Sequence, residues 1–183
     1  MDRLVRSTSK HSPLANVANV AAMRNALVKN ERAIEWTGGC QCGAVRYQLL
    51  TPPDHASICH CRMCQRACGQ PFMTFARVSK ENLRWTRGSP SVFRSSNIVE
   101  RGFCSACGTP LSYRRVESDT VSVTICSLDD PEPARPVLQF GVEGKLSWTG
   151  ALDGLPTERT EDWMRENNIA HIESRQHVAQ QGG

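Results

Sequence analysis

The arrangement of the cysteines constrains this chain more than any other feature. Seven of the nine lie in three short clusters, and two of these clusters are pairs followed at once by glycine. In chain order the clusters are Cys40/Cys42, Cys59/Cys61/Cys64 and Cys104/Cys107. Grouped cysteines of this kind typically hold zinc through their thiolates. The fold must therefore bring segments that are distant in the sequence together around metal.

Strand geometry explains the spacing of the first two clusters. In an extended chain, residues i and i+2 point to the same side. Cys40 and Cys42 can therefore face one ion, and so can Cys59 and Cys61. His60 must then face elsewhere, so we expect it beside the site or at the surface rather than as a ligand.

The two pairs followed by glycine together supply four thiolates. Four thiolates form a closed tetrahedral site, and closed sites of this kind are structural. Zinc binding there would contribute on the order of 10 kcal/mol to folding. We therefore predict a structural zinc held by Cys40, Cys42, Cys104 and Cys107.

The central cluster offers only three thiolates from one tight loop. Three protein ligands leave one position on a tetrahedral zinc open, which is typical of a catalytic site. We predict a second zinc held by Cys59, Cys61 and Cys64. The alternative is a closed site with a fourth protein ligand, for which the candidates are Cys68, His55 and Cys126.

The charge around this loop favours an anionic ligand. Between His55 and Lys80 the sequence contains arginine and lysine but no aspartate or glutamate. A guanidinium group can hold both oxygens of a carboxylate, so Arg62 and Arg66 are candidate substrate-binding residues. The alternative is that these arginines only offset the charge of the thiolates.

Net charge and hydropathy exclude several classes of partner. Residues 1–30 contain five of the 22 lysines and arginines and one of the 18 acids, which leaves 17 of each sign elsewhere. A neutral body argues against a nucleic-acid surface. We see no secretory signal and no apolar run of the ~20 residues needed to cross a bilayer. We therefore expect no membrane association and reduced cysteines in the cytoplasm.

Short alternating segments separated by glycine, proline or serine predict a mainly β fold. We expect a single domain of short antiparallel strands at 45–49, 57–61, 72–78, 83–85, 91–94, 98–103, 111–115, 121–125, 137–140 and 145–148. A helix is expected near 158–167. The predicted organisation is a flexible extension over residues 1–35, a zinc-binding domain over 36–155, and a short helix with a polar tail over 156–183.

Four runs carry a resemblance to a known family: GGCQCGAVRY, CHCRMCQRACGQPF, RGFCSACGTPLSY and SLDDPE. Over about residues 36–155 the chain resembles the glutathione-dependent formaldehyde-activating family, which also includes centromere protein V-like proteins. The resemblance implies a zinc-stapled, mostly β fold of the Mss4-like or β-tent type. It also implies two zinc ions per chain, with the same structural and catalytic ligand sets as those predicted above.

The resemblance further implies carbon–sulfur lyase activity, the condensation of glutathione with formaldehyde to S-hydroxymethylglutathione. The expected partners are a small thiol such as glutathione and a small aldehyde. The alternative function is a non-catalytic zinc-binding module that contacts a protein or chromatin partner. The sequence indicates no oligomeric state.

Overall fold

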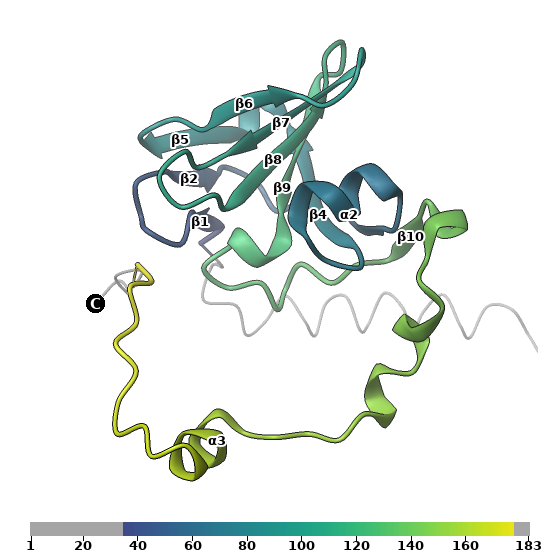
Figure 1. Cartoon of the computed structure of the whole chain (residues 1–183). Coiled ribbons are helices and arrows are strands. Elements are labelled where there is room, and N and C mark those ends of the chain that lie inside the picture. Colours follow the sequence, from purple (N-terminus) through teal and green to yellow (C-terminus); the bar gives the residue numbers. More distant parts are fainter. Residues whose placement is uncertain (1–34, 178–183) are drawn as a thin grey trace, which may run out of the picture. The chain divides into compact units, whose positions relative to one another are not determined.

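The computed structural model describes residues 35–177 and consists mainly of two β-sheets (Figure 1). The three-stranded sheet has the order β1 (Thr37–Gly39), β2 (Arg46–Leu49) and β5 (Leu83–Arg87). The seven-stranded sheet has the order β10 (Leu138–Phe140), β3 (His55–Cys59), β4 (Met73–Ser79), β9 (Thr120–Thr124), β8 (Pro110–Arg115), β7 (Val99–Phe103) and β6 (Ser91–Arg94). The predicted mainly β fold is confirmed. The predicted extension over residues 1–35 lies outside the described residues, except for Glu35.

Residues 35–177 contain two α-helices, one between two strands and one after the last strand. Helix α2 (Arg62–Cys68) connects β3 to β4, and α3 (Thr160–Glu166) confirms the helix expected near the C-terminus. Single 3₁₀ turns are η2 (Lys80–Asn82), η3 (Ile125–Ser127), η4 (Val142–Gly144), η5 (Ser147–Gly150) and η6 (Leu152–Gly154). No helix within residues 35–177 is both long and apolar enough to cross a bilayer.

The strand expected at 145–148 is wrong, because Ser147 and Trp148 lie in η5 and residues 145–146 pair with no strand. The Thr149 hydroxyl donates a hydrogen bond of 2.8 Å to the Leu146 carbonyl, and the Thr149 amide donates to the same oxygen at 3.1 Å. Side-chain hydroxyls that satisfy nearby backbone groups compete with strand pairing. The local turn therefore replaces the strand.

The expectation of purely antiparallel strands is also wrong at one edge. Strand β10 pairs parallel to β3, with Leu138 opposite Ser57 and Phe140 opposite Cys59. All the other strand pairs within the described residues are antiparallel. The parallel pair is possible because a connection of many residues separates β3 from β10.

A further short strand, β1, forms at residues 37–39. Gly38 lies in β1, opposite Tyr47 of β2. A Cβ atom on Gly38 would lie 2.5 Å from the Tyr47 ring and 2.5 Å from the Ser127 carbonyl oxygen. Glycine is required here because the backbones and the tyrosine ring approach too closely for a side chain.

Residues 127–129, which follow β9 of the large sheet in the chain, form hydrogen bonds with the small sheet. The Tyr47 hydroxyl and the Ser127 hydroxyl form a buried hydrogen bond of 2.8 Å. The Arg46 guanidinium donates two hydrogen bonds to the Asp129 carboxylate, which also accepts one from the Thr37 hydroxyl at 2.6 Å. These contacts give the SLDD part of the sequence a structural role in joining the sheets.

The buried side chains form two clusters. The larger includes Tyr47, Leu111 and Val123, and it also contains Cys40 and Cys104. The smaller consists of Cys59, Cys64, Met73 and Phe75. Each group of cysteines is thus built into a core of its own, which fixes the positions of the thiols.

Candidate metal centres and substrate cavity

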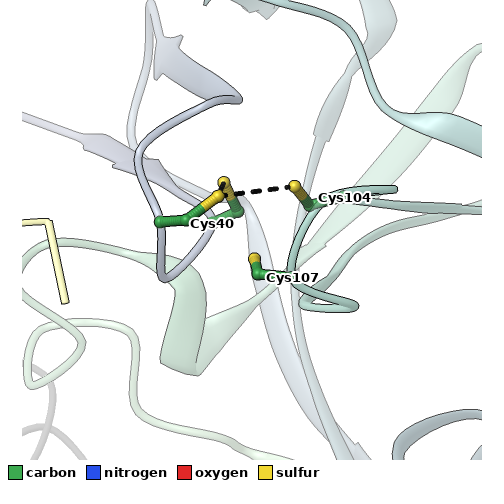
Figure 2. Close-up of side chains that lie close together, drawn as sticks. Cys40, Cys104 and Cys107 are labelled. Carbon is green, nitrogen blue, oxygen red and sulfur yellow. Dashed lines mark hydrogen bonds between the residues drawn. The ribbon is translucent and has the colours of Figure 1, made fainter. Parts of the chain in front are cut away.

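Four cysteines from two distant loops meet near the small sheet. The sulfur atoms of Cys40, Cys42, Cys104 and Cys107 all lie within 4.8 Å of one another. Figure 2 shows Cys40, Cys104 and Cys107 directed toward a common point. Such a set of four thiols matches the donors of a closed tetrahedral zinc site.

Backbone and hydroxyl groups favour the thiolate at two of the four cysteines in this cluster. Burial alone would raise the pKa of Cys40, but the Val45 amide donates to its Sγ atom at 3.2 Å and the net shift is downward. Burial likewise opposes ionisation of Cys107, yet hydrogen bonds from Thr109 lower its pKa to about 6. Hydrogen bonds to the charged form of a group stabilise that form, so Cys40 and Cys107 favour negative charge. Burial raises the pKa of Cys104. A backbone hydrogen bond would lower the pKa of Cys42, but hydrogen bonds with neighbouring thiols raise it.

The second cluster lies where β3 ends and α2 begins. The sulfur atoms of Cys59, Cys61 and Cys64 lie within 4.8 Å of one another, and no further Cys, His, Asp or Glu of the described residues joins them at that distance. Cys59 and Cys64 are buried, whereas Cys61 is partly exposed. The donor set suits zinc with three protein ligands.

Strand β10 supports this loop. The His60 amide donates to the Phe140 carbonyl at 2.9 Å, and the His60 Nε2 atom lies 3.0 Å from the Gln139 side-chain oxygen. His60 is buried with only 2% exposure. The expectation that it lies beside the site rather than binding as a ligand agrees with this geometry, but it is not at the surface.

Two further contacts hold the loop from outside. The buried Gln65 side chain of α2 donates to the carbonyls of Pro71 at 3.1 Å and Gly144 at 2.8 Å. Gly141 has a φ of 65°, and a Cβ atom there would lie 2.9 Å from the Cys61 amide nitrogen. The 141–144 turn is therefore packed directly against the cysteine loop.

Arg101 of β7 is the charged group closest to this cluster. Its Nη2 atom donates to the Cys64 sulfur at 3.3 Å, and its guanidinium lies 5.1 Å from the centre of the Tyr113 ring. Arg101 is only 7% exposed and forms no ion pair with any carboxylate in residues 35–177. A buried charge requires a partner, and here the partner is a cysteine sulfur.

The negative charge of this cluster falls mainly on Cys64. The hydrogen bond from the Cys59 thiol and the adjacent Arg101 lower the pKa of Cys64 to about 5, although burial acts in the opposite direction. As the donor in that hydrogen bond, Cys59 has a raised pKa. The fixed guanidinium therefore favours a thiolate at Cys64.

The three candidates for a fourth ligand lie outside the cluster. The Cys68 thiol donates to the backbone carbonyls of Cys64 at 3.1 Å and Phe72 at 3.6 Å, and burial raises its pKa. Cys126 is exposed in η3, and His55 begins β3 at the end opposite Cys59. In this geometry none of the three closes the site.

Arg62 and Arg66 both lie on α2 but have different surroundings. The Arg62 guanidinium donates to the Gln65 side-chain oxygen at 3.2 Å. Arg66 lines a cavity of about 590 Å³ whose wall also includes Arg101. The structure thus places one of the two predicted substrate-binding residues at a cavity beside the Cys59/Cys61/Cys64 cluster.

Sequence reasoning missed Arg101. The only local signal was its place in an alternating strand that leads into Cys104, and a charged residue on a strand is usually exposed. The contact with Cys64 forms because β7 packs near α2 in the fold. The sequence pattern of neither segment indicates that the two are neighbours.

The chain is similar to a described family and to individual known proteins. The sequence matches the family described as "Glutathione-dependent formaldehyde-activating enzyme" over residues 35–143. An uncharacterized lyase of Schizosaccharomyces pombe is 27% identical over 114 residues, which cover 54% of this chain and 82% of that protein. A crystal structure of a Rhodobacter sphaeroides protein is 25% identical with a TM-score of 0.46, and the match covers 56% of this chain and 98% of the other.

A mainly β chain with two cysteine clusters that could hold metal is a cysteine-rich β domain. Within that class, this chain belongs to the glutathione-dependent formaldehyde-activating family, whose sequence pattern spans more than half of its length.

Proposed function

We propose that this protein is a zinc-dependent carbon–sulfur lyase that condenses glutathione with formaldehyde to give S-hydroxymethylglutathione. The observation that carries the proposal is the Cys59/Cys61/Cys64 cluster, which gathers three thiols and one buried guanidinium but no fourth protein ligand within residues 35–177. Family membership and the lyase-named relative support the reaction class.

The donor sets fit two zinc ions. Cys40, Cys42, Cys104 and Cys107 would hold a structural ion, and Cys59, Cys61 and Cys64 would hold a catalytic ion with an open position. We also propose that the domain is of the Mss4-like type over residues 36–155, followed by a helix and polar tail over 156–183 and preceded by a flexible extension over 1–35. The cytoplasm is the proposed location, since it keeps thiols reduced.

Zinc at the three-cysteine site would supply a Lewis acid that favours the deprotonated form of a thiol. The chain's own contribution is charge balance. Three thiolates and a divalent ion carry a net charge of −1, and the Arg101 guanidinium beside Cys64 offsets it. A neutral site accepts an additional anion at lower electrostatic cost than a negative one.

The reaction itself is an addition. The thiol loses its proton, its sulfur forms a bond to the aldehyde carbon, and the carbonyl oxygen gains a proton, with no change in oxidation state. The role of the protein is to hold the two reactants together, which is a large source of rate enhancement. Arg66, and less directly Arg62, would attract a carboxylate of glutathione, and the cavity position favours Arg66.

Exchange spectroscopy by NMR on a mixture of glutathione and formaldehyde tests the proposed reaction. We expect the zinc-loaded protein to accelerate exchange between free and adduct forms. Cys64→Ser should abolish the acceleration, whereas Cys126→Ser, which changes an exposed cysteine outside both clusters, should retain it. Equal exchange rates with and without the protein would exclude this activity. If the protein then bound two zinc ions that did not respond to added thiols, the alternative function as a non-catalytic zinc-binding module would be favoured.

A further inference from the structure

The cavity beside the three-cysteine cluster has the size of a small-molecule site. It measures about 590 Å³ and lies between α2, which contributes Met63 and Arg66, and strands β6–β8, which contribute Phe93, Arg101 and Phe103. Pockets for small ligands usually span about 300–1,000 Å³. Formaldehyde would occupy only a small part of this volume.

One side chain connects the cavity wall to the cluster. Arg101 lines the cavity and at the same time donates to the Cys64 sulfur at 3.3 Å. Met73, which also lines the cavity, packs in the same buried cluster as Cys59 and Cys64. A ligand in the cavity would therefore lie next to the proposed reaction centre.

The charges on the wall are of one sign. Arg66 and Arg101 line the cavity, and neither aspartate nor glutamate does. Arg101 already contacts the Cys64 sulfur, whereas Arg66 makes no ion pair with the described part of the chain. Arg66 is therefore available to bind a carboxylate through its planar fork.

The rest of the wall is strongly apolar for such a site. Phe93 is 62% exposed and Met63 is 52% exposed, and both line the cavity. Phe103 and Pro110 add further apolar surface. Exposed apolar groups gathered around one hollow commonly mark a binding site. Their natural complement is a ligand with an apolar body.

We propose that this cavity binds an amphipathic organic acid, with its carboxylate at Arg66 and its apolar body against Phe93 and Met63. The assignment of this acid as the substrate rests on the proposed function. The binding itself follows from the lining of the cavity alone.

Isothermal titration with 4-phenylbutyrate tests the binding, with 4-phenylbutan-1-ol and butyrate as matched probes. The alcohol lacks the charge and butyrate lacks the ring, so each should bind about tenfold more weakly than 4-phenylbutyrate. Arg66→Gln should remove the preference for the acid over the alcohol. Arg84→Gln, which changes an exposed arginine of β5 outside the cavity, should leave it unchanged, and Phe93→Ala should remove the preference for the ring.

Three results would overturn the proposal: no binding of 4-phenylbutyrate, equal effects of Arg84→Gln and Arg66→Gln, or a ring preference that survives Phe93→Ala. Because Arg84, Arg66 and Phe93 are all exposed, their substitutions should leave the fold intact. The titration involves no turnover. If 4-phenylbutyrate binds as expected while the glutathione exchange test fails, the cavity assignment stands and the proposed reaction is withdrawn.

Discussion

Arg101 combines burial, positive charge and a sulfur partner in one side chain. Its guanidinium touches Cys64, the Met73 sulfur at 3.7 Å and the Ser95 hydroxyl at 3.1 Å. These fixed contacts orient the donor toward Cys64. Groups that hydrogen-bond to metal ligands commonly tune the affinity of the metal site.

We predict that Arg101→Met weakens zinc binding at the three-cysteine site by about 10- to 100-fold, because the thiolate at Cys64 loses its charge partner. The four-cysteine site should keep its affinity, since Arg101 contacts none of its members. Competition with a chromophoric chelator measures both sites in one titration. Arg94→Met, an exposed arginine of β6, is the control, and equal affinities in the two variants would contradict the role of Arg101.

At the level of elements, the 141–144 turn and helix α2 enclose the cysteine loop from two sides. Gly141 and Gly69 both have positive φ values, 65° and 67°. Only Gly141 also faces a close neighbour, because a Cβ atom on Gly69 would meet nothing within 4 Å. Substitution of Gly69 therefore tests backbone strain alone, whereas substitution of Gly141 tests backbone strain together with a steric clash.

Gly69→Ala should cost roughly 1–2 kcal/mol of unfolding free energy, which is the penalty of a left-handed conformation alone. Gly141→Ala should cost more, because its Cβ atom would also lie only 2.9 Å from the Cys61 amide nitrogen. This distance is too short, so Cys61 would have to move. Chemical denaturation gives both values. A cost for Gly141→Ala no greater than that for Gly69→Ala would show that the turn does not support the cysteine loop.

The Arg46–Asp129 pair joins the two sheets and gives stability a defined pH dependence. Burial would raise the pKa of Asp129, but hydrogen bonds from Arg46 and Thr37 outweigh it and the net shift is downward. A carboxyl group whose pKa is lower in the folded state stabilises the fold above its unfolded pKa of about 3.9. That contribution is lost as the pH falls through the folded pKa.

Asp129→Asn should therefore cost about 1–3 kcal/mol at pH 7. The difference from the native protein should shrink as the pH falls below about 4. Denaturation at a series of pH values measures this difference. Asp54→Asn is the control, because its ion pair with Arg77 is about half exposed and should contribute less than ~1 kcal/mol. A pH-independent cost for Asp129→Asn would contradict the account.

For the molecule as a whole, the sequence predicted those features that depend on residues close together in the chain. The spacing within each cysteine cluster indicated which neighbouring thiols face the same side, because i, i+2 alternation and short turns act within a few residues. The grouping of the two distant pairs came instead from the need for four thiolates at a closed site. The strands with clear alternation were also predictable. Whether these thiols bind zinc stays a prediction.

What the sequence did not reveal depends on distant segments. The parallel pairing of β10 with β3, the contact of Arg101 with Cys64 and the packing of Gly141 against Cys61 each join parts of the chain 37 or more residues apart. The pattern of residues within a single strand or helix does not predict these long-range contacts. The strand expected at 145–148 failed for a related reason, since a side-chain hydrogen bond at Thr149 favoured a turn.

Loss of the four-cysteine site should affect the whole fold. A structural zinc contributes on the order of 10 kcal/mol, which is comparable to the entire stability of a typical domain. Cys104→Ser should therefore be largely unfolded at 37 °C, as judged by circular dichroism, whereas Cys126→Ser should resemble the native protein. A Cys104→Ser variant with native thermal stability would contradict a structural role for this site.

Cobalt substitution tests the central claim most directly, that one site is complete and the other lacks a protein ligand. Two cobalt ions per chain should bind with the visible spectra of tetrahedral thiolate sites. Added glutathione should change the spectrum of one ion, and the change should disappear in Cys64→Ser but persist in Cys126→Ser. Two cobalt ions whose spectra do not respond to glutathione would show that neither site is open to a substrate.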